Sequence, residues 1–542
     1  MSHPGLPAPV WAVKTAVVTA LVGVGGGVAG IAVWLALQLI QFVAFGSPFG
    51  GHVEAADAPS ALNRFLALVA AGVLTAVAWW AMRRWGKAVV SVPAAVAGRR
   101  MPSLVTVANA GVQILAVGLG ASIGKEVAPR ELGSWLAQCI TARAGLSARE
   151  TKILVACGAA SGLAAVYDVP LGGALFAVEV LLGELTLATA LPAFVTSAIA
   201  AGVARLVIPD EVLYSVPTTH LSPSLLVWAV VVGPLLGFAG VGFVKLTNRL
   251  QTLAPTGWRL LVVLPVVFAM VGLIAVPFPQ VLGNGRALGL VAMNASLDTT
   301  TMYGLAPVAV LLVLGLVKTI TTSATIGAGA VGGTLTPSIA IGSALGAAAG
   351  AAWVLLWPAD GGTLVSFAFI GAAAFLATTM RAPFTALVLV VEFTQQGVDV
   401  LVPALLAVSG SVAVGYVLAR RRSAQMALHA TTRPPDRPRP AAPGPPGRAP
   451  DAVGSIGARA GHEAPRRREE PVMAGFDDIT KKAQDLLKSS KVQDALKSEK
   501  AEGISDKVFD GVADAVKKAT GGKHDGQIDK AREQADKHVG NE

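Results

Sequence analysis

Four charged residues stand in the middle of an apolar stretch: Lys125, Glu126, Arg130 and Glu131, all within "GASIGKEVAPRELG" (Gly120–Gly133). The apolar runs "VQILAVGL" and "SWLAQCI" flank this segment. An ionisable side chain at the centre of a bilayer costs on the order of 2.5–3.5 kcal/mol, so it marks a functional site by default. The chemistry open to such groups on a glycine- and proline-rich turn is ion binding and proton transfer.

The segment is typical of a loop that begins a helix inside a membrane. The first N–H groups of a helix have no partner within it and carry the positive end of the helix dipole. They therefore form an anion site without a fixed charge. Gly332–Pro337, "GGTLTP", repeats this form, and Pro129 and Pro337 fit the first turn of a helix. If both helices converge, their N–H groups could replace the hydration shell of a small anion while binding it weakly.

Glu126 is a tethered competitor for such a site. Its ionised carboxylate can occupy the position of the anion, and its protonated or displaced form opens the path. The alternative is ordinary compensation of the helix dipole by an acid in the first turn. The apolar surroundings and the neighbouring Gly124 favour gating.

The elements that position these residues must be membrane helices. Of the 542 residues, 53% are hydrophobic and only 14% are charged, and the mean hydropathy is +0.62. A soluble protein carries about 25% charged residues. The net charge of +10 comes largely from arginines near apolar runs and in the linker, which predicts cytoplasmic loops rather than nucleic-acid binding. These loops are Met82–Lys87, Ala97–Pro102 and Ala419–Ser423.

Some apolar runs are long enough to span a bilayer, and others are broken by Gly or Pro. The long runs include Val227–Val244, Leu260–Val276 and Val308–Val317 with its flanks. Broken helices at membrane depth survive where they line a cavity or are buried in protein, and they mark transporter sites. The predicted breaks are at Gly120–Pro129, Val169–Pro170, Gly332–Pro337 and Ala382–Pro383.

The two halves of the apolar region repeat each other. "GAASGLAAVYDVPLGGALFAVE" (Gly158–Glu179) matches "GAAAFLATTMRAPFTALVLVVE" (Gly371–Glu392) at a constant spacing of 213 positions. A looser match pairs Gly124–Ser134 with Gly332–Ser343. We expect Glu179 and Glu392 to pair or cap within the protein.

These segments resemble the CLC family of chloride channels and chloride/proton antiporters. The likeness covers about residues 10–430 and is carried by the ordered motifs "GKEVAPRELG", "VYDVPLGGALFAVEVLLGE", "VLGNGRALG", "GAGAVGGTLTPSIAIGSALG" and "RAPFTALVLVVEFTQ". The resemblance implies an all-α polytopic fold with inverted repeats. It also implies a homodimer in the lipid bilayer of the plasma membrane, with both termini cytoplasmic. The expected function is transport of chloride or similar anions, as a channel or as an exchanger that also carries protons.

The resemblance assigns roles to residues of both glycine-rich segments. Glu126 matches the external gating glutamate of the family. Gly333–Pro337 matches a G-x-F-x-P motif in which the second and third N–H groups bind the central anion. The anion-binding residues implied are Gly124, Lys125, Glu126, Val127, Gly333, Thr334 and Leu335.

The sequence departs from the family pattern on the inner side. Val127 and Ala128 replace the usual Gly-Pro after the gate, and Arg99 stands where a chloride-coordinating serine is common. The pore tyrosine has no clear counterpart, because Tyr416 comes too early and the nearest aligned position is Gln425.

The sequence also does not assign a single route for protons. Antiporters commonly carry an internal glutamate directly after the position of Glu179, and Val180 stands there, as in many channel members. Glu184 is the nearest candidate for a proton path from Glu126. The balance between channel and antiporter leans slightly to passive conduction.

The chain beyond the apolar region divides into two further parts. We expect a membrane domain over 1–430, a disordered Pro/Arg-rich linker over 431–471 and a Lys/Asp-rich helical tail over 472–542. The tail resembles short actinobacterial antitoxin-like proteins. It is a true fusion or a second reading frame joined to the first. An alternative function is a membrane-anchored regulator whose tail binds a partner protein.

Other classes find no support in the sequence. Cys139 and Cys157 fit neither a disulfide framework nor a metal motif. No Ser/His/Asp set or phosphate loop is evident, and His524 fits a solvated position. We therefore expect no enzyme activity and no cofactor, with chloride as the substrate.

Overall fold

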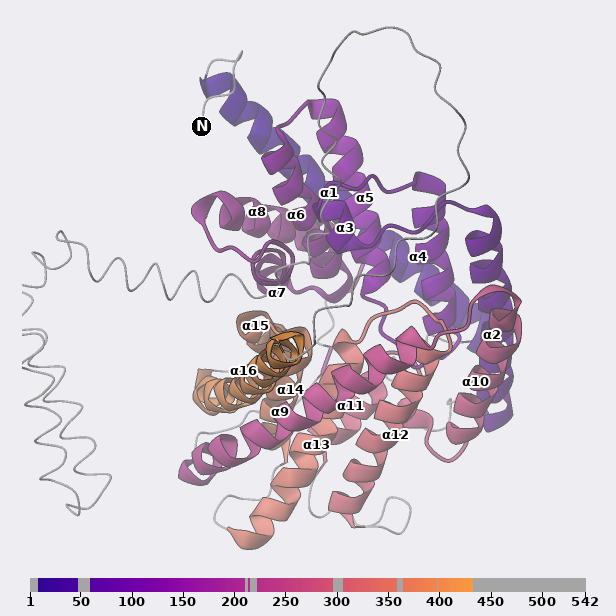
Figure 1. The fold of residues 1–542 in the computed structure, drawn as a ribbon, viewed down its shortest axis with the longest axis vertical. Coiled ribbons are helices and arrows are strands. Elements are labelled where there is room, and N and C mark those ends of the chain that lie inside the picture. The colour runs from indigo at the N-terminus through magenta and orange to yellow at the C-terminus, as the bar shows by residue number, and fades with distance from the viewer. Residues whose placement is uncertain are drawn as a thin grey trace, which may run out of the picture. The chain divides into compact units, whose positions relative to one another are not determined.

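The described part of the chain folds almost entirely into helices (Figure 1). The computed structural model describes residues 8–46, 59–209, 213–214, 222–295, 306–357, 364–396 and 398–431, with only the backbone at 8, 9, 398 and 422–431. All of them belong to one compact unit, Met1–Asp436. Thr431, the first residue of the predicted linker, is instead the last residue of α16. The rest of the predicted linker and tail, 432–542, and the side chain of Gln425 lie outside the described residues.

Sixteen α-helices occur in these ranges, and the described backbone contains no strand. Their bounds are α1 Ala8–Phe45, α2 Ala61–Trp85, α3 Val92–Val96, α4 Ser103–Gly118, α5 Val127–Ala144, α6 Ala148–Tyr167, α7 Pro170–Leu175, α8 Leu187–Ala204, α9 Pro223–Thr252, α10 Leu260–Ile274, α11 Arg286–Met293, α12 Pro307–Gly327, α13 Leu335–Leu356, α14 Val365–Met380, α15 Pro383–Thr394 and α16 Leu401–Thr431. A π-helical turn, η2, follows α7 over Phe176–Leu182.

Eight described helices are long and apolar enough to cross a bilayer. The predicted runs Val227–Val244 and Val308–Val317 fall within α9 and α12, and Leu260–Val276 begins with α10 and extends two residues beyond it, so these spans are confirmed. Along α10 the exposed side chains Val262, Val266 and Met270 recur every fourth residue, which presents an apolar stripe at the surface. Such a stripe faces lipid in a membrane protein.

The predicted breaks are present as well. The backbone is non-helical between α4 and α5 and between α12 and α13. Helices α7 and α15 each begin with a proline at the first position, Pro170 and Pro383, where a missing N–H does no harm. At each of the four breaks, one helix ends and the next begins within a few residues.

The repeat seen in the sequence recurs in the backbone. Helices α6 and α14 end in left-handed residues 213 positions apart, Asp168 (φ 54°) and Arg381 (φ 55°). The next residues, Val169 and Ala382, have similar dihedral angles of −125°, 72° and −139°, 83°. The same turn thus connects each long helix to its proline-initiated partner.

Glycines set the close packing inside each repeat. A Cβ on Gly133 of α5 would strike the carbonyl of Gly158 in α6, and a Cβ on Gly342 of α13 would strike that of Gly371 in α14. Figure 1 shows the first helix pair in the violet half of the ribbon and the second in the salmon half. Small residues at such crossings let membrane helices approach closely.

Two glutamates connect the repeats by capping each other's short helix. The Glu179 carboxylate accepts the N–H groups of Phe384 (3.2 Å) and Thr385 (2.7 Å) at the start of α15. The Glu392 carboxylate accepts the N–H groups of Leu171 (2.9 Å) and Gly172 (2.6 Å) at the start of α7. The expected role of both residues as caps is therefore confirmed, and the caps are crossed between the halves.

Candidate functional site: two broken helices around a buried carboxylate

The two glycine-rich segments meet at the centre of the protein. The N–H of Gly124 donates to the carbonyl of Gly333 at 2.8 Å, and the N–H of Gly333 donates to the carbonyl of Gly124 at 3.0 Å. Helix α5 begins three residues after Gly124, and α13 begins two residues after Gly333. The predicted convergence of two helix starts is therefore present.

Glu126 lies fully buried between these helix starts. Its Oε1 accepts the backbone N–H of Leu335 at 2.7 Å, and its Oε2 accepts the hydroxyl of Thr336 at 3.2 Å. The hydroxyl of Tyr167 lies 3.5 Å from the same Oε2, at the limit of a hydrogen bond. The carboxylate thus uses a backbone donor at the start of α13, which is the kind of donor an anion would use.

Glycine is required at two positions around this carboxylate. A Cβ added to Gly124 or to Gly333 would overlap the carboxyl group of Glu126. The backbone of both segments therefore approaches the carboxylate as only glycine allows.

Two cations flank the carboxylate without pairing with it directly. The Lys125 Nζ lies over the ring of Tyr167, 4.9 Å from its centroid. The Arg130 Nε donates to the backbone carbonyl of Glu126 at 2.8 Å, and its guanidinium lies over the ring of Phe176. Both charges contribute positive potential near the site.

Glu131 forms hydrogen bonds with a different set of side chains. Its Oε2 accepts the side-chain amides of Asn109 at 2.9 Å and Gln113 at 3.0 Å, both in α4. Trp79 in α2 donates its indole N–H to Asn109. This carboxylate therefore joins α2, α4 and α5.

Lys318 of α12 fixes the loop that leads to Glu126. It is fully buried, and its Nζ donates to the Ser122 hydroxyl at 2.9 Å and to the carbonyls of Val281 and Gly283 at 2.8 Å each. Ser122 stands two residues before Gly124. The buried ammonium group thus connects that segment to the loop that precedes α11.

The remaining residues predicted for anion binding lie on the same backbone. Val127 is the first residue of α5, and Thr334 is the residue that precedes α13. Of the two N–H groups that the motif implies, that of Leu335 is bonded to Glu126. Sequence reasoning did not assign the hydroxyls of Tyr167 and Thr336, which also contact the carboxylate.

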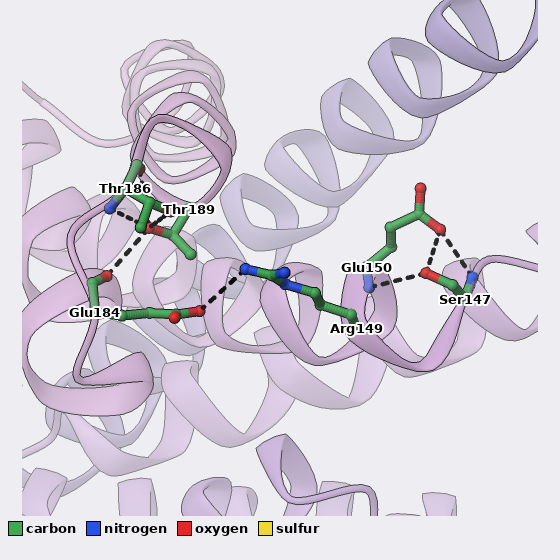
Figure 2. Close-up of polar contacts among 6 residues, drawn as sticks. All are labelled: Ser147, Arg149, Glu150, Glu184, Thr186 and Thr189. Atoms are coloured by element: carbon green, nitrogen blue, oxygen red, sulfur yellow. Dashed lines mark hydrogen bonds and ion pairs between the residues drawn. The ribbon is translucent and has the colours of Figure 1, made fainter. Parts of the chain in front are cut away.

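Glu184 lies apart from this cluster, just beyond η2. Figure 2 shows Arg149 of α6 reaching toward it, with Arg149 Nη2 4.0 Å from Glu184 Oε1. The two side chains are 52% and 43% exposed, so water screens this pair. Nearby, Ser147 and Glu150 form the capping box that begins α6. The role of Glu184 in a proton path stays a prediction.

Of the residues that depart from the family pattern, Ala128 is buried at the start of α5, whereas Arg99 lies at the surface. Arg99 is exposed, and its carbonyl accepts the side-chain amide of Gln138 at 2.8 Å. Tyr416 is 41% exposed on α16. Within the described ranges, no group of three or more His, Cys, Asp or Glu side chains could hold a metal ion.

Comparison with known proteins gives two regions of similarity. The family model of the voltage-gated chloride channels matches residues 67–416. A model described as MT0933-like antitoxin protein matches residues 481–539.

Individual relatives agree with the first match. A ClcB-like chloride channel protein of Ralstonia nicotianae is 29% identical over 424 residues, which cover 75% of this chain and 94% of the relative. The voltage-gated ClC-type chloride channel ClcB of Escherichia coli is 31% identical over 304 residues, 54% of this chain and 68% of the relative.

Solved structures show the same fold. A slow cyanobacterial Cl⁻/H⁺ antiporter superposes with a TM-score of 0.64 at 21% identity, covering 77% of this chain and 98% of that one. A CLC-type fluoride/proton antiporter gives a TM-score of 0.58 at 18% identity, with 74% and 95% covered. The broken helices and repeats described above thus occur in an arrangement shared with these transporters.

Proposed function

The chain belongs to the voltage-gated chloride channel family, and we propose that it conducts chloride or a similar small anion along a path that the Glu126 carboxylate closes. The observation that carries this proposal is the bond between Glu126 Oε1 and the N–H of Leu335. A carboxylate oxygen at the start of α13 occupies the place where a permeating anion would be bound.

Opening then requires the carboxylate to leave Leu335. Protonation removes its negative charge, and an incoming anion competes for the same N–H group. The loss of charge weakens the bonds from Leu335 and Thr336, because hydrogen bonds to ionised groups are the stronger ones. Anion flux should therefore rise as the pH falls. Other ionisable groups around the gate include Lys125, Arg130, Glu131, Tyr167 and Tyr214.

The test is anion efflux from proteoliposomes across a range of pH. Glu126→Gln should conduct with little dependence on pH, since an amide cannot lose its proton. Arg143→Gln removes a charge from an exposed position at the end of α5 and should keep the pH response of wild-type flux. A Glu126→Gln protein with the wild-type pH response would refute the gate assignment.

Proton flux separates the two modes of transport. An exchanger takes up protons against a pH gradient when a chloride gradient drives it, and a channel does not. If Glu184 carries protons to the inner side, Glu184→Gln abolishes this uptake while chloride flux continues. Val180 at the usual internal position supports passive conduction.

The proposed setting is a homodimer in the plasma membrane with both termini in the cytosol. Its support is the family membership and the arginine-rich loops, since positive charge favours the cytosolic side. The proposed layout is a transport domain over 1–430, a linker over 431–471 and a tail over 472–542.

A second candidate function concerns the tail. Its match to an antitoxin family model over 481–539 supports binding of a partner protein. Full-length protein and a chain truncated after Asp436 can be compared for partner capture after crosslinking. A partner retained equally by both would exclude the tail as the binding part.

A further inference from the structure

A cavity of about 360 Å³ adjoins the gate. Its lining includes Lys125, Tyr167, Asp168, Asn284 and Arg286. Tyr167 belongs both to this lining and to the group around the Glu126 carboxylate, so the cavity lies next to the gate.

Two cations line this cavity together, and the Glu126 carboxylate also acts on one of them, Lys125, electrostatically. Lys125 and Arg286 are close enough to interact electrostatically. In the described part of the chain, neither forms an ion pair with a carboxylate within 4.0 Å. Like charges repel strongly where water is scarce, and an anion between them removes that cost.

The acidic residue of the lining does not supply this anion. Both carboxylate oxygens of Asp168 accept the Nε of Arg205 at 3.0 Å, and Arg205 Nη2 lies 2.9 Å from Oδ2. Asp168 is thus already neutralised. The Arg286 Nε donates to the carbonyl of Leu213 at 3.1 Å, which fixes the guanidinium in place.

We propose that this cavity is an outer anion site, where Lys125 and Arg286 hold a small monovalent anion before it reaches the N–H of Leu335. This site rests on the proposed function, because its anion is the one that the gate admits. A water molecule occupies about 30 Å³ in the liquid, so the cavity has room for an anion with part of its hydration shell.

The chemistry of the two cations defines the class of ligand. An ammonium group is a point charge and suits a halide, whereas a planar guanidinium can bind two oxygens of an oxyanion. The site should therefore accept chloride and also a planar oxyanion such as nitrate. Positive walls also raise the local concentration of anions beside the gate.

Flux at varied outer anion concentration tests the site. Arg286→Gln and Lys125→Gln should each raise the half-saturating outer chloride concentration about tenfold, as expected for loss of one charged hydrogen bond. Arg286→Lys should keep the chloride value and raise that of nitrate. Arg143→Gln removes an equal charge from an exposed position at the end of α5 and should change neither. Wild-type values in both glutamine variants would overturn the proposal.

Equilibrium binding of nitrate to the purified full chain tests the outer site even where a variant shows no anion flux. Nitrate binding, followed by calorimetry, should weaken about tenfold in Arg286→Gln and persist in Glu126→Gln. Equal binding by wild type and Arg286→Gln would overturn the outer site. Binding that depends on Arg286 in a protein without anion flux would instead refute the proposed transport function and leave the site standing.

Discussion

The Glu126 carboxylate is held by neutral donors, and these donors determine how firmly it is held in the position of the proposed gate. Leu335 gives a backbone N–H, and Thr336 and Tyr167 give hydroxyl groups. A direct ion pair would hold the carboxylate more firmly, and removing one partner of a buried pair costs 3–5 kcal/mol. For the proposed gate, neutral donors imply a smaller barrier to opening.

Tyr167→Phe tests the weakest of these contacts. The hydroxyl is 3.5 Å from Glu126 Oε2, so its contribution should be at the low end of 0.5–1.5 kcal/mol for a hydrogen bond. The closed state should lose about that much stabilising free energy, and anion flux at neutral pH should rise about two- to threefold. Proteoliposome efflux measures it. A fall in flux would show that the hydroxyl serves permeation rather than closure.

Gly333→Ala tests the fit of the carboxylate. The added Cβ would overlap the carboxyl group of Glu126, so the side chain must leave its place. We expect the pH response of anion flux to be lost, as in Glu126→Gln. Gly111→Ala is the matched control, because a Cβ at Gly111 of α4 meets nothing within 4 Å. A normal pH response in Gly333→Ala would mean that the carboxylate does not close the path from this position.

At this scale the sequence predicted the charged side chain and the backbone donor but missed the hydroxyls. Glu126 was conspicuous because it interrupts apolar sequence. Tyr167 and Thr336 were not, because each is ordinary in a helix and contacts the gate only through folding. Lys318 carried an available signal, since a lysine within the apolar run of α12 is costly unless it is used.

At the scale of elements, the crossed caps are one set of contacts that connects the two halves. Glu179 caps α15, and Glu392 caps α7. Proline at the first position of each short helix was readable from the sequence, and so were the breaks that precede it. The sequence did not show which helix each glutamate caps, because each one reaches a helix more than 200 residues away along the chain.

Glu392→Ala should destabilise this connection. The N–H groups of Leu171 and Gly172 would lose their acceptor, at a cost of about 1–2 kcal/mol, as for other helix caps. The apparent midpoint of thermal unfolding in detergent should fall. Glu184→Ala is the control, since its exposed pair with Arg149 contributes under about 1 kcal/mol. Equal midpoints for the two variants would contradict the structural role of Glu392.

At the scale of the whole molecule, the described residues form one unit that includes every residue of the candidate site. Its long spans and repeat were predictable from hydropathy and from the spacing of 213 positions. The cavity at Lys125 and Arg286 was not, because its walls come from segments far apart in the chain: α1, the end of α4 and the loop after it, the end of α6, the segment after α8, and the start of α11 with the loop before it.

Truncation after Asp436 tests the independence of this unit. We expect the shortened chain to insert, to purify and to conduct anions at the rate of the full chain, because the gate, the caps and the cavity all lie before this residue. Efflux per unit of reconstituted protein is the measurement. A large loss of flux in a well-folded truncated protein would show that the tail takes part in transport.

The crossed caps also have a consequence for synthesis on the ribosome. The ribosome synthesises the first turn of α7 long before the glutamate that caps it, because Glu392 follows Leu171 by 221 residues. At 5–20 residues per second, this interval lasts roughly 10–40 s. During that time the first half sits in the bilayer with two backbone donors unmatched, and only the arrival of the second half completes it. We therefore expect the nascent first half to be open to early degradation by membrane proteases, a vulnerability that ends when α15 is inserted.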